Sequence, residues 1–287
     1  MPAPDEVIHK ICEARQGLQI EEEIGEPGGQ KWVYRANDPA FGPCCLKIIQ
    51  EGGTTEQARL GRELLVLQET DQCPNLPKLF FAPAEPIAIG DRAYPWYLEE
   101  LLVGETLSEL IGTPWEEQEC LRLIRDVGTA INELWTRKVV HRDIKPENIF
   151  CTERGYVLLD PGMARHQVLP PLTPPGRLPG TRGYRSPEQY RLPGERLDAR
   201  HDIFQLGVVA FVVLTGHHPF NREDAAEAWA NNPYHGPDDV LGELGEHVST
   251  PMQKLLTFML SPYPHQRYRS PDRLLRVVQG MIEEGGE

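Results

Sequence analysis

The stretch that decides the fold is HRDIKPEN at residues 141–148, which is followed by LDPG at residues 159–162. The two stretches carry carboxylate, amide and ammonium groups on what we expect to be neighbouring loops. Asn148 and Asp160 offer hard oxygen ligands, which suit Mg²⁺ because this ion takes few protein ligands and completes its shell with phosphate oxygens and water. The pattern therefore indicates a site for a magnesium-bound phosphate.

Two further residues of the first stretch have the chemistry to transfer a phosphoryl group. Asp143 can accept the proton of a hydroxyl group, and Lys145 can neutralise charge on a phosphoryl group in transfer. An isolated aspartate in a loop is more often a solvated turn residue. The common spacing of all these residues is what favours the catalytic interpretation.

Length and charge restrict the classes of protein to which this chain can belong. Its 287 residues allow one large domain or two lobes. It has 29 Lys and Arg against 43 Asp and Glu, a formal charge of −14, so neither nucleic acid nor an anionic membrane is an expected partner. The N-terminus lacks the apolar region of a signal peptide, and no apolar stretch approaches the roughly 20 residues that cross a bilayer. Because the six cysteines form no CxxC pair either, we expect a soluble cytoplasmic protein.

Hydrophobic patterning predicts an α+β fold in two lobes. Residues 1–17 form a lead-in with no assigned element, residues 18–102 a small N-lobe and residues 103–287 a larger, mainly helical C-lobe. In the N-lobe we expect an antiparallel sheet and one helix, with strands at 18–24, 32–36, 44–49, 79–81, 87–89 and 94–102 and the helix at 55–69. In the C-lobe we expect helices at about 120–134, 202–215, 252–260 and 271–283, short strands at 148–151 and 156–159, and a long Pro- and Gly-rich loop at 161–187.

The order of these motifs resembles the eukaryotic-type (Hanks-type) serine/threonine protein kinases. HRDIKPEN, with Asp160 twelve residues beyond Asn148, is similar to their catalytic and metal-binding loops. The resemblance covers about residues 18–280 and implies the bilobal protein-kinase fold, in a bacterial stand-alone catalytic domain. It is also carried by GT at 180–181, YRSPE at 184–188, DIFQLG at 202–207, TGHHPF at 215–220 and Arg267.

The resemblance implies a role for each matching residue. Lys47 matches the strand lysine that grips the α- and β-phosphates of ATP, and Glu63 matches the helix glutamate that pairs with it. Asp143 corresponds to the catalytic base, and Lys145 to the cation that serine/threonine kinases place near the transferring phosphate. The other implied roles are metal binding by Asn148 and Asp160, an activation-loop contact by Arg142, positioning by Thr181, a structural ion pair between Glu188 and Arg267, and a structural role for Asp202.

The glycine-rich loop departs from the family pattern. It reads IGEPGGQKWVY at residues 24–34 and keeps Gly28 and Gly29, which let backbone N–H groups approach a phosphate. Lys31 replaces the third glycine, and two interpretations of it stay open. It could add a cation over the phosphates, or it could face solvent.

The hinge and the metal-binding loop also depart from the pattern. Glu100 and Leu102 fall in the hinge and are expected to contact ATP. The position before them, normally apolar, is Glu99, so either the register is off by one or an acidic group lines the pocket. Pro161 replaces the phenylalanine that usually follows the metal-binding aspartate, and because proline fixes φ we expect a loop that flips less readily.

These features lead us to expect an ATP-dependent serine/threonine protein kinase. We expect it to use Mg²⁺, or Mn²⁺ in its place, to act on a protein substrate or on itself, and to be regulated by a partner protein or through phosphorylation of Thr173. Two alternatives stay open. One is a pseudokinase scaffold, which usually has lost the base, the lysine or a metal ligand. The other is a small-molecule kinase of the antibiotic-phosphorylating type, which usually lacks the SPE segment.

Overall fold

The chain divides into two compact units. The first contains residues 1–72 and 77–103, and the second contains residues 73–76 and 104–287. The structure is a computed structural model, and the residues it describes are 3–24, 31–50, 54–160, 165–166, 180–181, 183–191, 197–219, 242, 244 and 248–285. An antiparallel sheet in the first unit and a largely helical second unit confirm the predicted α+β class.

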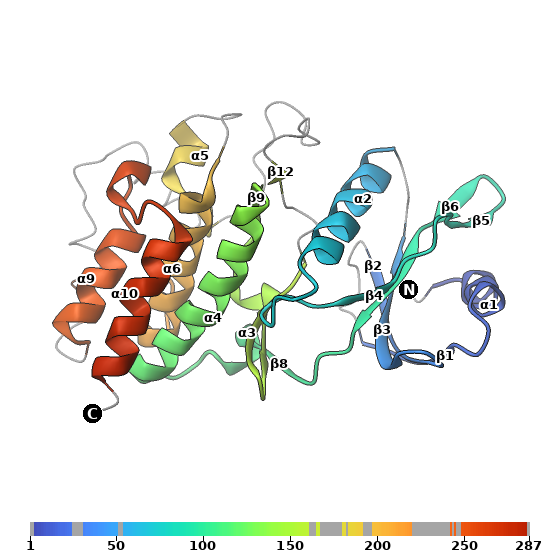
Figure 1. Cartoon of the computed structure of the whole chain (residues 1–287), viewed down its shortest axis with the longest axis horizontal. Helices are drawn as coiled ribbons and strands as arrows, with labels where there is room; N and C mark the ends of the chain where they lie inside the picture. The colour runs from blue at the N-terminus through green and yellow to red at the C-terminus, as the bar shows by residue number, and fades with distance from the viewer. Residues whose placement is uncertain are drawn as a thin grey trace. The chain divides into compact units, whose positions relative to one another are not determined.

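A five-stranded antiparallel sheet organises the first unit (Figure 1). Its order is β1-β2-β3-β7-β4, with β1 at Gln19–Glu23, β2 at Lys31–Asp38, β3 at Gly42–Ile49, β7 at Trp96–Glu100 and β4 at Leu79–Phe81. A separate hairpin pairs β5 (Ile87–Ile89) with β6 (Arg92–Tyr94). The single strand predicted over 94–102 is therefore wrong. Pro95 separates β6 from β7, because proline has no N–H to donate to a ladder.

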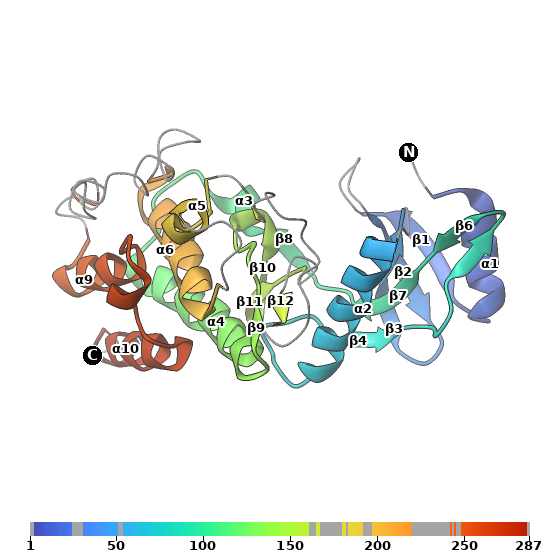
Figure 2. The same ribbon diagram turned by 90° about the horizontal axis from the view of Figure 1, so that it is seen from above.

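The two faces of this sheet build two separate cores. Leu46 of β3 belongs to a buried cluster with Val7 of helix α1 (Asp5–Ala14). Tyr97 of β7 belongs to a second cluster, formed with α2 (Thr54–Glu69). The two helices lie on opposite sides of the sheet in both views (Figure 1, Figure 2). Successive residues of a strand point to opposite faces, so β3, β7 and β4 contribute side chains to both clusters.

Helices make up most of the second unit. The helix α4 (Glu117–Thr136) packs against both α6 (Ala199–Thr215) and α10 (Pro271–Glu284), as Figure 2 shows. The shorter helices are α3 (Leu107–Leu110), α5 (Pro187–Arg191) and α9 (Thr250–Met259), with 3-10 turns η1 (Pro146–Asn148) and η4 (Pro264–Gln266). Two small antiparallel sheets have the orders β11-β10-β8 and β12-β9, with β8 at Gly104–Thr106, β9 at Val139–Val140, β10 at Ile149–Thr152, β11 at Gly155–Leu158 and β12 at Arg165–His166.

The helix α6 is the buried centre of the second unit, as its apolar sequence predicts. Nearly all its residues are buried, including the charged Asp202 in its first turn. The side chain of Asp198 caps its start by accepting from the backbone N–H of Arg200, and Gly216 ends it in the left-handed conformation at φ 77°. Within the described residues, none of the helices combines the length and apolar character that crossing a bilayer needs.

Residues 73–76 belong to the second unit although the first unit surrounds them in sequence. The side-chain amide of Asn75 donates to the carbonyl of Tyr156 at 2.9 Å. The backbone N–H of Leu158 donates to the carbonyl of Asn75, also at 2.9 Å. These two bonds fix the segment along β11.

Candidate active site

The HRDIKPEN loop is held in place by two polar side chains of α6. The carboxylate of Asp202 accepts from the backbone N–H of His141 at 2.8 Å and of Arg142 at 2.9 Å. The side-chain carbonyl of Gln205 accepts from the N–H of Ile144 at 3.1 Å. Arg142 lies in the left-handed region at φ 70°, so the backbone turns sharply where these bonds hold it. The side chains of α6 thus fix the start of the loop by accepting from the backbone N–H groups of the loop.

Asp202 is fully buried, and two effects act on its pKa in opposite directions. Burial raises the pKa of Asp202 to about 7, while the two backbone amides that it binds act to lower it. Two N–H donors on two carboxylate oxygens favour the ionised form locally. We interpret Asp202 as a support for the loop, since both of its bonds are to backbone.

Three of the expected site residues surround Asp143. Its Oδ1 accepts from the backbone N–H of Thr181 at 2.9 Å and from the Thr181 hydroxyl at 2.8 Å. Its Oδ2 accepts from the side-chain amide of Asn148 at 3.1 Å and lies 3.9 Å from the ammonium nitrogen of Lys145. These contacts orient a carboxylate that is still 14% exposed, as a base that receives a proton from a substrate needs to be.

Gly180 makes the approach of Thr181 to this carboxylate feasible. Its φ is +82°, and a Cβ built on it would lie 2.5 Å from the carbonyl oxygen of Arg142. Only glycine adopts this conformation without strain and leaves room for the neighbouring carbonyl. The GT pair that the resemblance singled out is therefore explained by backbone contact with the loop.

The segment that carries Asp160 is tied to the same loop. The backbone N–H of Leu159 donates to the carbonyl of Asn148 at 2.8 Å, and the Nε2 of His141 bonds the carbonyl of Leu159 at 2.9 Å. The Nδ1 of His141 accepts from the N–H of Asp143 at 3.3 Å. Burial lowers the pKa of His141, so the ring is neutral with its proton on Nε2. Sequence reasoning assigned no role to this histidine, although it stands first in the motif.

Asn148 and Asp160 have the donor chemistry to hold a divalent cation. The amide nitrogen of Asn148 donates to Asp143. The side-chain oxygen of Asn148 is therefore directed away from Asp143. Asp160 lies in the left-handed conformation at φ 57° directly after the anchored Leu159. One amide oxygen and one carboxylate fit the small protein share of a shell completed by phosphate oxygens and water. Among the described residues there is no larger cluster of metal-ligating side chains.

A buried ion pair stabilises the part of the second unit that follows Thr181 in the sequence. Both terminal nitrogens of Arg267 donate to the carboxylate of Glu188 at 2.8 Å, and the Arg267 side chain is fully buried. The guanidinium also donates to the carbonyls of Ser261 and Arg200 and lies 4.8 Å from the ring centroid of Phe204. Arg267 thereby outweighs the effect of burial and lowers the pKa of Glu188.

In the first unit, Lys47 lies on the sheet face that α2 covers. Its ammonium nitrogen is 2.6 Å from a carboxylate oxygen of Glu99. The expected partner, Glu63 of α2, is instead 2.6 Å from the ammonium of Lys31 and accepts from the hydroxyl of Tyr97 at 2.7 Å. The ion pairs therefore differ from the predicted Lys47–Glu63 pair, because a second lysine and a second glutamate share this face.

The hinge residues follow at the end of this sheet. Glu99 is 4% exposed and stands opposite Cys45 in the β3–β7 ladder, so it faces the same side as Lys47. Of the two interpretations of Glu99, the structure fits the acidic group on the site face. Glu100 ends β7, where its N–H donates to the carbonyl of Lys78 at 2.9 Å, and Leu102 follows as a half-buried residue.

Comparison with known proteins identifies the family. The protein kinase domain matches residues 18–276. The chain belongs to the protein kinase family. It is 28% identical over 299 residues to the serine/threonine-protein kinase pkn3 of Myxococcus xanthus, which covers 99% of this chain and 53% of the relative.

Two other kinases with similar sequences are also bacterial. Pkn1 of Myxococcus xanthus is 32% identical over 196 residues, covering 66% of this chain and 28% of the relative. PknL of Mycobacterium tuberculosis is 31% identical over 206 residues, covering 69% of this chain and 49% of the relative. Both are named as serine/threonine-protein kinases. The chain spans about half or less of the length of these relatives.

Several expected residues of the kinase site lie outside the described part of the chain. They are Gly28 and Gly29 of the glycine-rich loop, Pro161 after the metal-binding aspartate, and Thr173, the expected phosphorylation site. Their proposed roles remain predictions. The described part of the expected site residues therefore consists of the loop around Asp143 in the second unit and, separately, the charged face around Lys47 in the first unit.

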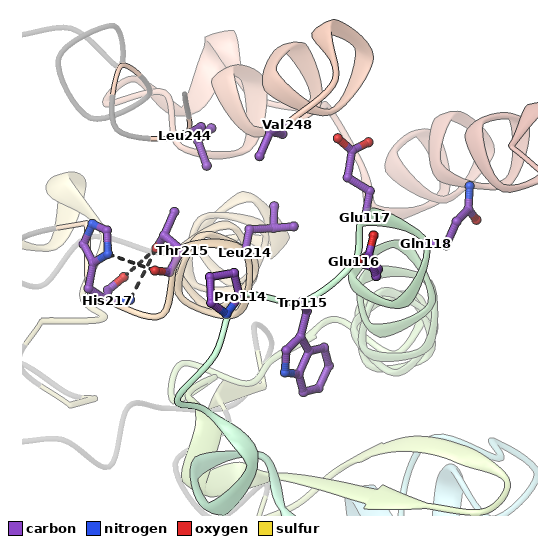
Figure 3. Close-up of a pocket in the computed structure, with 10 residues that line it drawn as sticks. All are labelled: Pro114, Trp115, Glu116, Glu117, Gln118, Leu214, Thr215, His217, Leu244 and Val248. Atoms are coloured by element: carbon purple, nitrogen blue, oxygen red, sulfur yellow. Dashed lines mark hydrogen bonds between the residues drawn. The ribbon is translucent and has the colours of Figure 1, made fainter. Parts of the chain in front are cut away.

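The second unit has a pocket at the ends of α4 and α6 (Figure 3). Its volume is about 560 Å³, and Figure 3 shows its lining residues, Pro114, Trp115, Glu116, Glu117, Gln118, Leu214, Thr215, His217, Leu244 and Val248. His217 bonds the carbonyl of Thr215 through its Nδ1 at 3.1 Å, whereas the ring of His218 meets Tyr184 edge-on. The two histidines thus make separate contacts at the turn after α6.

Proposed function

We propose that this chain is an ATP-dependent serine/threonine protein kinase of the cytoplasm that uses Mg²⁺ or Mn²⁺. The observation that carries the proposal is the cluster in which Thr181, Asn148 and Lys145 surround Asp143. A carboxylate held at one oxygen and approached by an ammonium at the other suits proton removal beside a developing phosphoryl charge. Membership of the protein kinase family supports the same activity.

In the proposed reaction, a serine or threonine hydroxyl oxygen bonds to the γ-phosphorus of ATP while the bond to the β-phosphate oxygen breaks. Asp143 accepts the hydroxyl proton, and ADP leaves with the electron pair of the broken bond. Lys145 neutralises charge on the transferring group, and Lys47 holds the α- and β-phosphates. Asn148 and Asp160 would hold the divalent ion, which neutralises the phosphate charge when bound. Most of the catalysis is positioning and charge stabilisation.

We also propose which residue type the chain phosphorylates and how its activity is regulated. Lys145, two residues after the base, is typical of kinases that act on serine and threonine, and the named relatives are of that class. Arg142, directly before the base, would contact a phosphate on Thr173 in an activated form, since a phosphate opposite arginine orders a loop. A protein partner is the expected regulator, and the charge of −14 makes nucleic acid an unsuitable one.

The pseudokinase alternative is not favoured. Such a protein usually lacks the base, the lysine or a metal ligand, and Asp143, Lys47, Asn148 and Asp160 are all present. A small-molecule kinase is also not favoured, because the chain retains the SPE segment, whose Glu188 is bound by Arg267.

The test is transfer of radiolabelled phosphate from ATP to casein and to the chain itself. We expect Asp143→Asn and Lys47→Met to lower the rate about 100-fold or more, as loss of an acid–base group or phosphate contact does. The matched controls, Asp272→Asn on α10 and Lys254→Met on α9, change exposed residues away from the site and should label like the wild type. Equal labelling by all five proteins would exclude the proposal, and so would no labelling by any.

A further inference from the structure

Gln205 is a fully buried polar residue of α6 for which the family resemblance implies no role. The stretch around it, IFQLGVVAFVVL at residues 203–214, contains no other amide and no charged side chain. A buried amide is costly unless its hydrogen bonds are made. Gln205 therefore marks a place where the apolar centre of the second unit meets polar groups of the chain.

The side-chain amide of Gln205 makes one hydrogen bond on each side of Asp143. Its carbonyl oxygen accepts from the backbone N–H of Ile144 at 3.1 Å. Its nitrogen donates to the backbone carbonyl of Arg142 at 3.4 Å, the longer of the two bonds. Ile144 is itself fully buried, so the first of these bonds takes the place of a bond to water.

These two bonds act on the two peptide groups that flank the α-carbon of Asp143. The carbonyl of Arg142 belongs to the peptide group before it, and the N–H of Ile144 belongs to the peptide group after it. Because peptide groups are planar, their relative orientation depends on φ and ψ of Asp143. One planar amide that binds an atom of each group restricts both angles, and with them the direction in which the Asp143 side chain leaves the backbone.

The other supports of Asp143 bind different atoms. Asn148 donates to its backbone carbonyl at 2.8 Å, and Thr181 donates twice to its Oδ1. The carboxylate of Asp202 accepts from two backbone N–H groups that precede Asp143 in the chain. Gln205 adds a contact that spans the residue itself, from the peptide group before it to the peptide group after it.

We propose that Gln205 is a positioning residue of the phosphoryl-transfer site, and that it orients the carboxylate of Asp143 by binding the backbone on both sides of it. The proposal rests on the proposed kinase function and deepens it. Because Gln205 is buried in α6 and bonds the backbone of the loop, it acts on the reaction through Asp143. Its removal should therefore slow the chemical step and leave the use of ATP almost unchanged.

The first test follows the backbone itself and needs no activity. Gln205→Leu keeps a similar side-chain volume and removes both bonds. Amide hydrogen exchange measured by NMR should become about tenfold faster or more at the N–H of Ile144, because that group loses its bond. The N–H of His141, which Asp202 binds, should keep its protection. Unchanged exchange at Ile144 would overturn the proposal, and so would equal acceleration at both groups, because a general loosening of the second unit has that effect.

A matched variant controls for the loss of a buried polar side chain elsewhere in the second unit. Ser261, which follows α9, is 4% exposed, and its hydroxyl donates to the side-chain oxygen of Gln266 at 2.7 Å. Ser261→Ala should change neither the exchange at Ile144 nor kcat. If Ser261→Ala lowers kcat as much as Gln205→Leu does, the effect is a general loss of stability and the proposal fails.

The second test is the phosphate-transfer assay with casein. Gln205→Leu should lower kcat about tenfold, because small misplacements of a catalytic group are costly, and should change KM for ATP by less than about twofold. In the Asp143→Asn background the same change should lower the residual rate no further, since it acts through the Asp143 carboxylate. An equal lowering in both backgrounds would show a general structural effect and would overturn the proposal. A raised KM with an unchanged kcat would also overturn it.

The third test, Gln205→Glu, distinguishes the two bonds of the amide. A protonated carboxyl group has a donor and an acceptor and can make both bonds, whereas a carboxylate only accepts and would repel the carbonyl oxygen of Arg142. Burial keeps such a carboxyl group protonated to a higher pH than usual, so kcat relative to the wild type should fall as pH rises from about 5 to 8. The same ratio for Gln205→Leu should stay constant. The nearby titratable groups, Asp202, His141 and His201, are present in all three proteins, which is why the ratio is used.

The outcomes of these tests keep the two proposals apart. A constant ratio for Gln205→Glu would show that the bond to the Arg142 carbonyl does not matter, and would overturn the two-sided role of Gln205. Wild-type protein that transfers no phosphate would refute the kinase function. The exchange rate at Ile144 would still decide whether Gln205 holds the backbone beside Asp143.

Discussion

At the scale of single residues, two buried histidines of the second unit are neutral at pH 7 and each makes hydrogen bonds to its surroundings. His141 links the loop of Asp143 to the carbonyl of Leu159. His201, in the first turn of α6, bonds the hydroxyl of Ser186 at 2.6 Å through its Nδ1. Burial lowers the pKa of both rings, so protonating them in the folded chain needs a lower pH than in the unfolded chain.

His201 should make stability depend on pH in a definite direction. Burial lowers its pKa from 6.5 to about 4, an effect that the charge of Glu188 opposes and those of Arg267 and Arg142 reinforce. Between these values the unfolded chain binds a proton that the folded chain does not, so stability falls as pH decreases from 6.5 to 4. Relative to His201→Asn, the wild type should lose up to about 3 kcal/mol over this range.

Urea unfolding at a series of pH values checks this expectation. The neighbouring Asp202, with its raised pKa, titrates in the opposite direction, which is why the comparison is made with the His201→Asn variant and not with the wild type alone. His9→Asn, on the exposed side of α1, is the matched control and should follow the wild type at every pH. Parallel pH curves for the wild type and His201→Asn would contradict the prediction.

At the scale of elements, the contact of residues 180–181 with the loop of Asp143 depends on a glycine. Gly180→Ala would place a methyl group 2.5 Å from the carbonyl of Arg142 and strain a backbone at φ +82°. The segment must then shift, and the two bonds from Thr181 to Asp143 weaken. We expect the catalytic rate to fall about tenfold or more, because small misplacements near a catalytic group are costly.

A second glycine separates backbone strain from the loss of this contact. Gly90, in the β5–β6 turn, also has positive φ, at +56°, but a Cβ there would meet no atom within 4 Å. Gly90→Ala should lower the melting temperature modestly and leave kcat unchanged. If kcat of Gly180→Ala equals that of the wild type in the phosphate-transfer assay, Thr181 does not need to hold Asp143.

The sequence predicted elements, and the Glu188–Arg267 pair, better than it predicted the partners of Lys47. Strongly patterned segments such as α4 and α6 were predicted because their apolar spacing decides both helix and buried face. The helix α1 was missed because residues 1–17 were treated as a lead-in, although Val7 and Ile11 have the i,i+4 spacing of a buried helical stripe. The family motif likewise located Asp143 and its neighbours, since that cluster is local in sequence apart from Thr181.

The partners of Lys47 could not be predicted from motifs, because they depend on register across the sheet. Glu99 is 52 positions away in sequence (99 − 47 = 52), and a shift of one residue would turn it to the opposite face. The alternation of Tyr97 and Glu99 along β7 was a usable signal once Lys47 was placed on β3. Lys31 is a similar case, since either interpretation of it was compatible with the sequence alone.

At the scale of the whole molecule, contacts between residues far apart in the sequence stabilise the second unit. Glu188 and Arg267 are 79 positions apart and are joined by two bonds of 2.8 Å. Arg267→Met should strand the Glu188 carboxylate and lower the free energy of unfolding by about 3–5 kcal/mol. Arg276→Met, which breaks an exposed pair with Asp272 on α10, should cost less than about 1 kcal/mol.

Chemical denaturation of both variants measures the difference between the buried and the exposed pair. The double variant Glu188→Leu with Arg267→Met should regain much of the stability lost by Arg267→Met, because it leaves no uncompensated charge. A double variant less stable than Arg267→Met would mean that the contribution of Arg267 comes from its bonds to the carbonyls of Ser261 and Arg200 rather than from the ion pair.

The membership of residues 73–76 in the second unit limits how the gene can be cut. A fragment that starts at Gly104 would leave the N–H of Leu158 and the carbonyl of Tyr156 without the backbone and amide of Asn75. A plasmid encoding the helical half alone therefore has to carry these four residues, grafted by a short linker or supplied as a peptide. No single cut in the coding sequence separates the two halves with both intact.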